Sequence, residues 1–208
     1  NNLQIICSLL SLQSRYIDDK RYLQFFKETQ NRINSMALMH ENLYQSKDLA
    51  NVYLNDYVND LLKHLFHFHG IIPGNIALNT SVENISIDID TAVPFGLIIN
   101  ELVSNSLKHA FPANIENPRA GRKDEIKIDL QSVEDQIILT VSDNGVGFPE
   151  NLDFRNTESL GLQLVYILTE QLGGTITLDR RGGITFTIRF IQPKFVKNKE
   201  SKRKKVVK

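Results

Sequence analysis

The side chains best suited to chemistry lie in residues 94–112, which read PFGLIINELVSNSLKHAFP. Glu101, Asn105 and Lys108 follow one another at steps of four and three, so a helix places them on one side, with His109 beside them. The other side of this helix is apolar and indicates a buried face. It carries Leu97, Ile98, Leu102, Val103 and Leu107. Such a polar face suits a ligand site, but a solvated helix surface produces the same pattern. Other segments of the chain are needed to distinguish these two interpretations.

Two later segments carry groups that complement this helix. SDNGVGFP places Asp143 at a predicted strand end, just before Gly145 and Gly147, where glycines let a flat ligand approach the main chain. Asp-Asn-Gly is also ordinary turn chemistry. SLGLQLV begins a helix at Ser159, and free amides at a helix start attract phosphate oxygens. Mg²⁺ takes one or two protein oxygens besides phosphate oxygens, and Asn105 offers an amide oxygen. Together the three segments predict a nucleotide pocket.

Composition restricts the class of protein. The 208 residues are 41% hydrophobic, and 24 Lys and Arg balance 24 Asp and Glu, so no nucleic-acid partner is expected. The apolar runs are too short to span a bilayer. The single cysteine, Cys7, excludes an internal disulfide framework and fits a reducing compartment. We expect a cytoplasmic location, with any membrane attachment through segments of a longer parent chain, because the chain begins inside a predicted helix.

Residues 1–47 contain neither Pro nor Gly and predict a helical hairpin that turns at Asp18 and Asp19. The expected seam of the second helix consists of Tyr22, Phe26, Thr29, Ile33, Met36, His40 and Leu43. Two helices bury too little surface to be stable alone, so we expect a homodimer through residues 1–47 that forms a four-helix bundle. His40 lies on this seam and is interpreted as a packed residue, because a phosphoryl acceptor should face solvent.

Residues 48–192 predict a second domain of mixed strands and helices. Strands are expected at 52–54, 76–82, 85–89, 125–132, 136–142, 175–179 and 184–191, and helices at 55–69, 94–112 and 159–172. The strands at 76–82 and 85–89 are expected to form a hairpin, and 113–124 a loop. The fold class is therefore α+β, a helical hairpin followed by an α/β sandwich with a mixed, antiparallel-rich sheet. Residues 193–208 carry eight Lys and Arg against one Glu and predict a disordered basic tail.

The chain resembles a known family at these same segments. NELVSNSLKHAF, SDNGVGFP, SLGLQLV and the GGTITL and GGITFTI strands resemble the boxes of the GHKL-type (Bergerat) ATP-binding fold. NNLQIICSLLSLQSR and RINSMALMHENLYQS resemble the dimerisation helices of two-component sensor histidine kinases with short ATP lids. The resemblance covers residues 1–192. It implies transfer of the γ-phosphoryl group of ATP to a histidine, and then to an aspartate in the receiver domain of a response regulator.

The resemblance also implies roles for individual residues. Asp143 would accept a hydrogen bond from the adenine amino group, and Gly145 and Gly147 would shape the surface around the base. Asn105 would ligate a Mg²⁺ ion that bridges the phosphates. Lys108 and His109 would approach the phosphates or the ribose.

Two further roles concern the phosphates. Gly161 and Leu162 would anchor them through backbone amides. Glu101 stands where related ATPases carry a general base, and in a kinase it would instead polarise the attacking group or help to hold the water shell of the metal.

The sequence departs from the family in three respects. The acceptor histidine is expected in an HRVKNNLQ-like run a few residues before Asn1, whereas His40 matches the second helix. The phosphate box has one glycine, Gly161, and the lid at 149–160 is short. Ile184 stands where relatives often place a threonine. Two alternatives therefore remain open, namely an ATPase that uses Glu101 as its base and a non-catalytic dimeric nucleotide-binding module.

Overall fold

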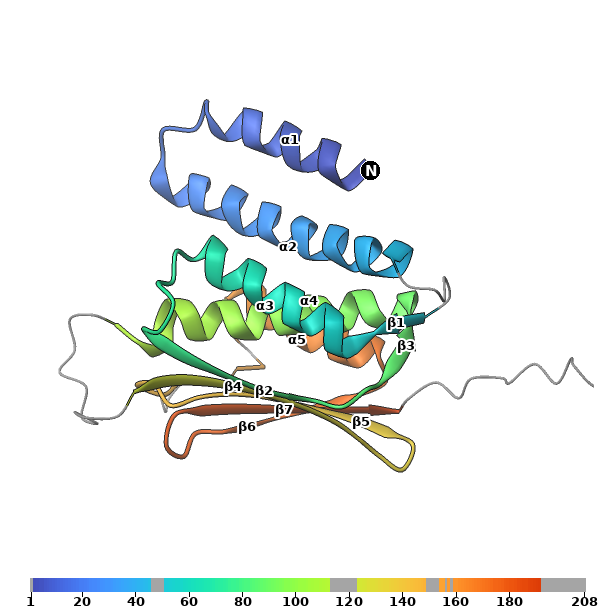
Figure 1. The fold of residues 1–208 in the computed structure, drawn as a ribbon. Coiled ribbons are helices and arrows are strands. Elements are labelled where there is room, and N and C mark those ends of the chain that lie inside the picture. Colours follow the sequence, from blue (N-terminus) through green and yellow to red (C-terminus); the bar gives the residue numbers. More distant parts are fainter. Residues whose placement is uncertain are drawn as a thin grey trace, which may run out of the picture.

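The computed structural model describes residues 2–45, 51–112, 123–148, 154–155, 157 and 159–191. Helices α1 (Asn2–Ser14) and α2 (Lys20–Gln45) form an antiparallel hairpin, and the predicted turn at Asp18 and Asp19 is confirmed. The Asp19 carboxylate accepts a hydrogen bond from the Arg21 amide (2.7 Å) at the start of α2. Figure 1 shows α2 lying between α1 and the remaining helices, so α2 contacts α1 on one side and α3 and α4 on the other.

The predicted seam of the hairpin is wrong in its register. Hydrogen bonds between α1 and α2 run from Gln4 to Glu41 (3.3 Å), from Cys7 to Asn34 (3.0 Å) and from Gln30 to the Cys7 carbonyl (3.2 Å). Met36 and Leu43, two members of the predicted seam, pack instead against the main hydrophobic core. The prediction assigned the apolar residues of α2 to its contact with α1. Some of them pack against the main core instead, because α2 has one contact face toward α1 and another toward α3 and α4.

The described residues between 51 and 191 form a layer of helices on a sheet (Figure 1), here called the sheet domain. The five-stranded sheet has the order β2 (Ile76–Val82), β4 (Asp124–Val133), β5 (Gln136–Asp143), β7 (Ile184–Ile191), β6 (Thr175–Asp179). The β2–β4 pair is parallel and the other pairs are antiparallel. The helices that cover one face are α3 (Leu54–Phe68), α4 (Ile89–Asn105) and α5 (Leu160–Gln171). The predicted helical hairpin followed by an α/β sandwich is confirmed.

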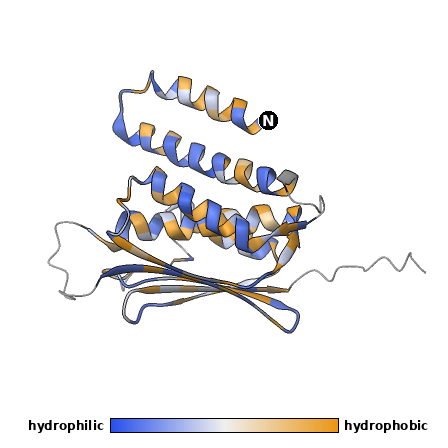
Figure 2. Cartoon of the chain, viewed as in Figure 1, coloured by the Kyte–Doolittle hydropathy of each residue, from blue (hydrophilic) through white to orange (hydrophobic). Residues whose placement is uncertain are grey.

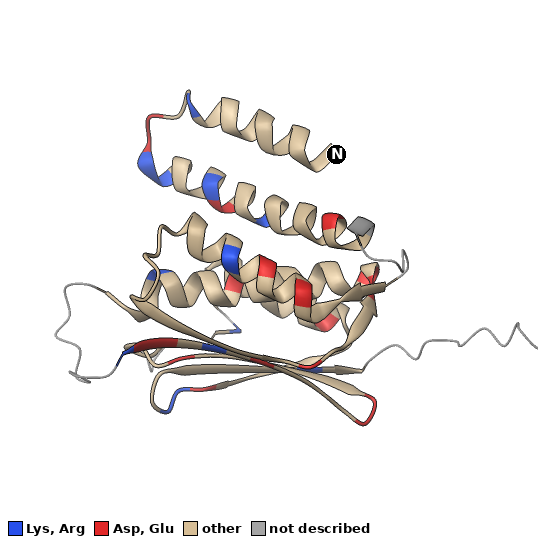
Figure 3. Cartoon of the chain, viewed as in Figure 1, with Lys and Arg blue, Asp and Glu red and all other residues tan. Residues whose placement is uncertain are grey.

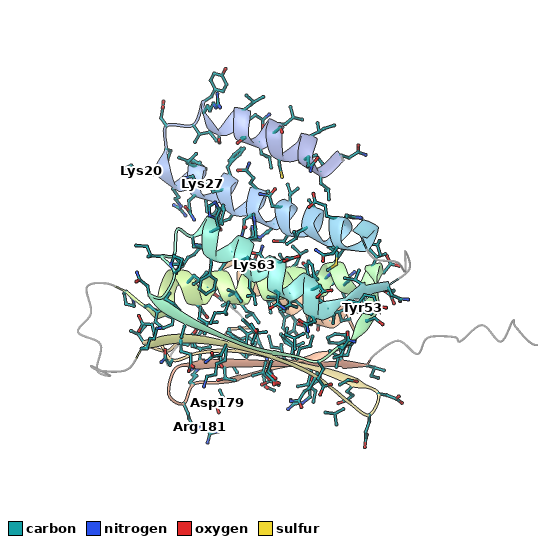
Figure 4. All side chains as sticks on the ribbon, viewed as in Figure 1. Lys20, Lys27, Tyr53, Lys63, Asp179 and Arg181 are labelled. Carbon is teal, nitrogen blue, oxygen red and sulfur yellow. The ribbon has the colours of Figure 1, made fainter. Side chains whose placement is uncertain are left out.

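Apolar and polar residues alternate along the strands, as Figure 2 shows. In β5, Ile137, Leu139 and Val141 are buried beneath the helices, whereas the residues between them are partly exposed. Charges of both signs are interspersed over the ribbon (Figure 3). An exposed ion pair between Asp179 and Arg181 (2.7 Å) lies at the turn between β6 and β7, on the side of the molecule away from α1 (Figure 4).

The predicted hairpin of residues 76–82 and 85–89 is wrong. Strand β3 (Ser86–Asp88) pairs with β1 (Asn51–Tyr53) in a separate two-stranded sheet, while β2 pairs with β4. Alternation along a strand identifies its buried face but does not identify its neighbour. Residue Ile89, predicted as strand, begins α4, because the Asp88 side chain caps this helix by accepting from the Thr91 amide (2.8 Å).

Some predicted segments lie wholly or largely outside the described residues. They are the loop at 113–124, the lid at 149–160 and the basic tail at 193–208. Among the helices that the structure describes, none is long and apolar enough to cross a membrane.

Helix α4 packs closely against α3 and α2. The Tyr57 ring of α3 is almost completely buried, which raises the pKa of its phenol, and its hydroxyl donates to the Ser35 carbonyl of α2 (3.5 Å). Gly96 of α4 provides the space for this ring, because a Cβ atom there would lie 1.9 Å from the Tyr57 hydroxyl oxygen and 2.7 Å from Cζ. One glycine thus sets how closely α3 approaches α4.

We predict that Gly96→Ala destabilises the protein, although alanine favours helices. Overpacking a core costs about 1–3 kcal/mol, and this exceeds the gain in helix propensity of about 1 kcal/mol. Urea unfolding followed by circular dichroism measures the difference. Lys27→Ala at an exposed position of α2 is the control and should change the free energy of unfolding by less than about 0.5 kcal/mol. A Gly96→Ala variant as stable as the wild type would show that this packing is loose.

Candidate functional site

A cavity of about 400 Å³ opens at the carboxyl end of α4, between the end of β5, the start of β7 and the start of α5. This volume is typical of small-molecule sites. Five residues to which the sequence assigned ligand roles line it, namely Asn105, His109, Asp143, Gly147 and Leu162. Ser159 and Ile184, also named from the sequence, line it as well. Segments far apart in the chain therefore meet at one hollow, as the motif order predicted.

Asp143 is held rigidly at the wall of this cavity. The residue is 7% exposed at the end of β5, and both carboxylate oxygens are oriented by the protein. Oδ2 accepts a hydrogen bond from the Ser106 hydroxyl (2.7 Å), and Oδ1 accepts from the Gly145 amide (3.0 Å). A carboxylate oxygen accepts more than one hydrogen bond, so Asp143 can accept a further donor from a ligand.

The two glycines after Asp143 allow the chain to close around the cavity. A Cβ atom on Gly145 would lie 2.3 Å from the Ala110 carbonyl oxygen, the same oxygen that accepts from the Val146 amide (2.9 Å). Gly147 has a φ of 88°, a left-handed conformation that favours glycine. A side chain at the first position is therefore excluded by contact, and one at the second is disfavoured by backbone conformation.

A π-helical turn, Ser106–Ala110, continues α4, and the polar residues that were predicted to share one face contact different parts of the molecule. Asn105 and His109 line the cavity, whereas Glu101 and Lys108 face α2. π turns are rare and occur frequently at functional sites, because the additional residue changes the direction of the side chains. Burial lowers the pKa of His109, with a contribution from the charge of Lys108.

Glu101 is 5% exposed and pairs with a single side chain of α2. Arg32 donates from Nε to Oε1 (2.8 Å) and from Nη2 to Oε2 (2.9 Å), a bidentate arrangement. The hydrogen bond to Glu101 raises the pKa of Arg32 above its usual value. Gly161, at the start of α5, leaves room for the carboxylate, because a Cβ atom there would lie 2.5 Å from Oε2. Gly161 thus touches Glu101 and does not line the cavity.

Lys108 forms a second ion pair with α2. Its Nζ lies 2.7 Å from Glu28 Oε1. Burial raises the pKa of Glu28, but hydrogen bonds from Lys108 and Gln24, together with the charges of Lys108 and Arg32, outweigh this effect, and the pKa lies below its ordinary value. Burial, assisted by the charge of Lys108, lowers the pKa of His69 to about 4, so this imidazole is neutral at neutral pH. His69 Nε2 lies 3.2 Å from the Ser104 hydroxyl oxygen.

Sequence reasoning missed three residues that contact the selected ones, namely Ser106, Arg32 and Glu28. Ser106 follows Asn105 directly, and this adjacency was the available signal. Glu28 and Arg32 stand four residues apart on α2, a spacing that is also ordinary on an exposed helix face. Glu28 lies 80 residues before its partner Lys108, and Arg32 lies 69 residues before its partner Glu101. Local spacing therefore did not identify these pairs.

The donor atoms around the cavity restrict which metal it could hold. No cluster of three His, Cys, Asp or Glu side chains suited to a metal ion is present among the described residues. An ion held mainly by protein carboxylates or imidazoles therefore does not fit this part of the chain. The Asn105 side chain fits a Mg²⁺ ion that takes most of its ligands from phosphates and water.

Two known families match the chain in succession. The family described as "Histidine kinase" matches residues 1–69. The family described as "Histidine kinase-, DNA gyrase B-, and HSP90-like ATPase" matches residues 90–194, which is just over half of the 208 residues.

Curated relatives are sensor kinases that extend beyond this chain. Blue-light-activated histidine kinase 2 of Erythrobacter litoralis is 28% identical over 190 residues, which cover 88% of this chain and 51% of the relative. Sensor histidine kinase PdtaS of Mycobacterium tuberculosis is 29% identical over 178 residues, which cover 85% of this chain and 34% of PdtaS. The chain therefore spans about half of the first relative and about a third of the second.

A solved structure has the same architecture. The histidine kinase domain of the blue-light-activated kinase EL346 from Erythrobacter litoralis superimposes with a TM-score of 0.68 at 25% identity, covering 91% of this chain and 87% of that one. The agreement extends over both the hairpin and the sheet domain. The chain therefore belongs to the histidine kinase-, DNA gyrase B- and HSP90-like ATPase family, and the two segments that it joins are those of a histidine kinase.

Proposed function

We propose that the cavity binds ATP with Mg²⁺ and that the chain is the ATP-binding core of a sensor histidine kinase. The observation that carries this proposal is the fixed carboxylate of Asp143 in a cavity of about 400 Å³. In the proposed complex Asp143 accepts a hydrogen bond from the adenine amino group. Gly147 and Leu162 contribute the adjoining walls, and Asn105 supplies an oxygen to the metal.

In this proposal ATP supplies the phosphoryl group, and the protein supplies position and compensating charge. The acceptor is a histidine expected upstream of Asn1, from which the group passes to an aspartate in the receiver domain of a response regulator. Lys108 and His109 approach the phosphates or the ribose, and amides near Gly161 and Leu162 anchor the phosphates. The relatives named histidine kinases support this assignment.

We propose residues 1–47 as the dimerisation hairpin, residues 48–192 as the ATP-binding domain and a cytoplasmic location for both. The hairpin carries large apolar side chains that one copy of the chain leaves exposed, consistent with a homodimer. They are Ile5, Ile6, Leu9 and Leu12 of α1, Tyr16 between the helices, and Tyr22 and Phe25 of α2. A second copy that covers these residues supplies the missing half of a four-helix bundle.

The position of Glu101 bears on the alternative of ATP hydrolysis. A general base has to reach the water that it activates. Both oxygens of Glu101 instead accept hydrogen bonds from Arg32, and the residue lies outside the cavity lining. The position of Glu101 outside the cavity lining thus does not support its use as the base of an ATPase. The relatives named histidine kinases support phosphoryl transfer. The presence in one chain of Glu101, Asn105, Lys108, Asp143, Gly145 and Gly147 counts against a non-catalytic module.

We predict that Asp143→Asn and Asn105→Ala weaken nucleotide binding in different ways. Asp143→Asn should raise the Kd of ATP about 10- to 100-fold with or without Mg²⁺, because it replaces a charged acceptor. Asn105→Ala should remove mainly the Mg²⁺-dependent part of the affinity. Isothermal titration with and without Mg²⁺ separates these effects. Asp179→Asn, the same chemical change at an exposed turn, is the control (Figure 4). Unchanged affinity in both cavity variants would refute the proposed pocket.

A second prediction concerns the partner of Asp143. Ser106→Ala removes the hydroxyl that orients Oδ2 and should raise the Kd of ATP about 3- to 10-fold, the range expected for one hydrogen bond. Ser104→Ala is the matched control, because this buried serine bonds to His69 away from the cavity and should leave the affinity unchanged. Thermal melts of both variants show whether a loss of affinity for ATP is accompanied by a loss of stability. Equal losses of affinity in the two variants would contradict the role of Ser106.

A further inference from the structure

At Asn144 the main chain leaves the sheet, directly after the carboxylate that lines the cavity. The pairing of β5 with β4 ends with Asp143 opposite Ile126. The Asn144 amide still donates to the Glu125 carbonyl (3.2 Å), and the chain then turns away from β4 toward the end of α4. The position of Asp143 therefore depends on how this exit from the sheet is held.

The Asn144 side chain bonds to two main-chain groups at the start of β4. Its Oδ1 accepts from the Glu125 amide (2.8 Å), and its Nδ2 donates to the Lys123 carbonyl (2.9 Å). In an antiparallel ladder, a carbonyl and an amide of the neighbouring strand would fill these two positions. A carboxamide contains both an acceptor and a donor, so the side chain of Asn144 replaces the main chain that has turned away.

The peptide that joins Asp143 to Asn144 is also held from the side of β7. A Cβ atom on Gly183 would overlap the Asp143 carbonyl oxygen and lie 2.9 Å from the Asn144 Cα atom, so only a glycine permits this approach. β7 pairs with β5 as far as Ile184, which lies opposite Asp143. The peptide thus lies between β7 and β4, and the Asn144 side chain supplies contacts on the β4 side.

Asn144 is the middle residue of the turn that orients the carboxylate. The Gly145 amide donates to Oδ1 of Asp143 (3.0 Å), which is the Asx turn that aspartate forms with the amide two residues later. Ser106 holds the other carboxylate oxygen. A shift of Asn144 moves the Gly145 amide relative to the carboxylate that it orients. Anchoring the middle residue to β4 therefore keeps the carboxylate in one geometry.

We propose that Asn144 is a positioning residue that sets the selectivity of the cavity for a 6-aminopurine base by holding the turn at Asp143. This inference rests on the proposed ATP site and assigns a selectivity residue to it. An amino group gains from the carboxylate only when donor and acceptor are aligned, because hydrogen bonds weaken steeply with misalignment. In the proposed complex the phosphates lie away from this turn, near Asn105 and the start of α5. Loss of the Asn144 contacts therefore reduces discrimination between bases more than affinity for triphosphates in general.

The test compares ATP with purine riboside triphosphate, which lacks only the 6-amino group, in isothermal titrations of the protein. The wild type should bind ATP about 10- to 100-fold more tightly than the analogue, the range for a hydrogen bond to a charged acceptor. Asn144→Ala should lower this ratio about 3- to 10-fold, because the bond is misaligned but not removed. The Kd of the analogue should stay close to its wild-type value. Asn79→Ala is the matched control and should keep the ratio, because the Asn79 carboxamide bonds to the side chain of Glu125 and not to its main chain.

Two further variants show whether Asn144 acts through Asp143. Asp143→Asn combined with Asn144→Ala should bind ATP no more weakly than Asp143→Asn alone, because changes that act through one interaction do not add. Asn144→Asp keeps the acceptor for the Glu125 amide but loses the donor to the Lys123 carbonyl, so it should also lower the ratio. Its added charge affects both nucleotides alike, because both carry the same triphosphate.

The outcomes separate this inference from the proposed function. A wild-type protein that does not distinguish ATP from the analogue refutes the proposed recognition of adenine by Asp143. A wild type that distinguishes them, together with Asn144 variants that keep the wild-type ratio, overturns the positioning role. Equal losses of affinity for both nucleotides overturn it as well, because they show structural support alone. Circular dichroism establishes that each variant is folded, and if Asn144→Ala is not, the ratio for Asn144→Asp decides in the same way.

Discussion

The structure depends on the burial of α4, because a helix covered on several sides must find partners for every polar group it carries. The sheet, α3, α5 and α2 enclose this helix, and Asn100, Glu101 and Ser104 lie within the enclosed stretch. Burying a carboxylate without a partner costs far more than a single contact gains. Arg32 satisfies this requirement for Glu101, and His69 does so for Ser104. The docking of the hairpin on the sheet domain follows from this need.

The cavity lies at the carboxyl end of α4, beyond the stretch that the other elements enclose. After Asn105 the helix changes to a π turn, and its side chains no longer all meet other helices. The turn places Ser106 against Asp143 and His109 at the cavity wall, so the change of helix type connects the core to the site. Close contact of Gly145 with Ala110 completes this junction. Stability and ligand geometry are therefore set by the same few residues.

The sequence predicted what depends on local pattern and failed where partners are distant. Periodicity located nearly every element, and the spacing around Asn105 and Asp143 identified residues that meet at one cavity. The pairing of β3 with β1 was missed, because alternation contains no information about neighbours. The separation of Glu101 from Asn105 was missed as well. It depends on Arg32, whose position relative to α4 follows only from the docking of two domains.

The two sides of the hairpin differ in what covers them. Toward the sheet domain, the ion pairs and amides around Glu101 lie on the same helix as Met36, Met39 and Leu43, which pack in or against the main hydrophobic core. That side is therefore covered within one copy of the chain. The outer surface of the hairpin instead carries exposed large apolar side chains, and covering them requires a further surface, as the proposed homodimer through the hairpin supplies.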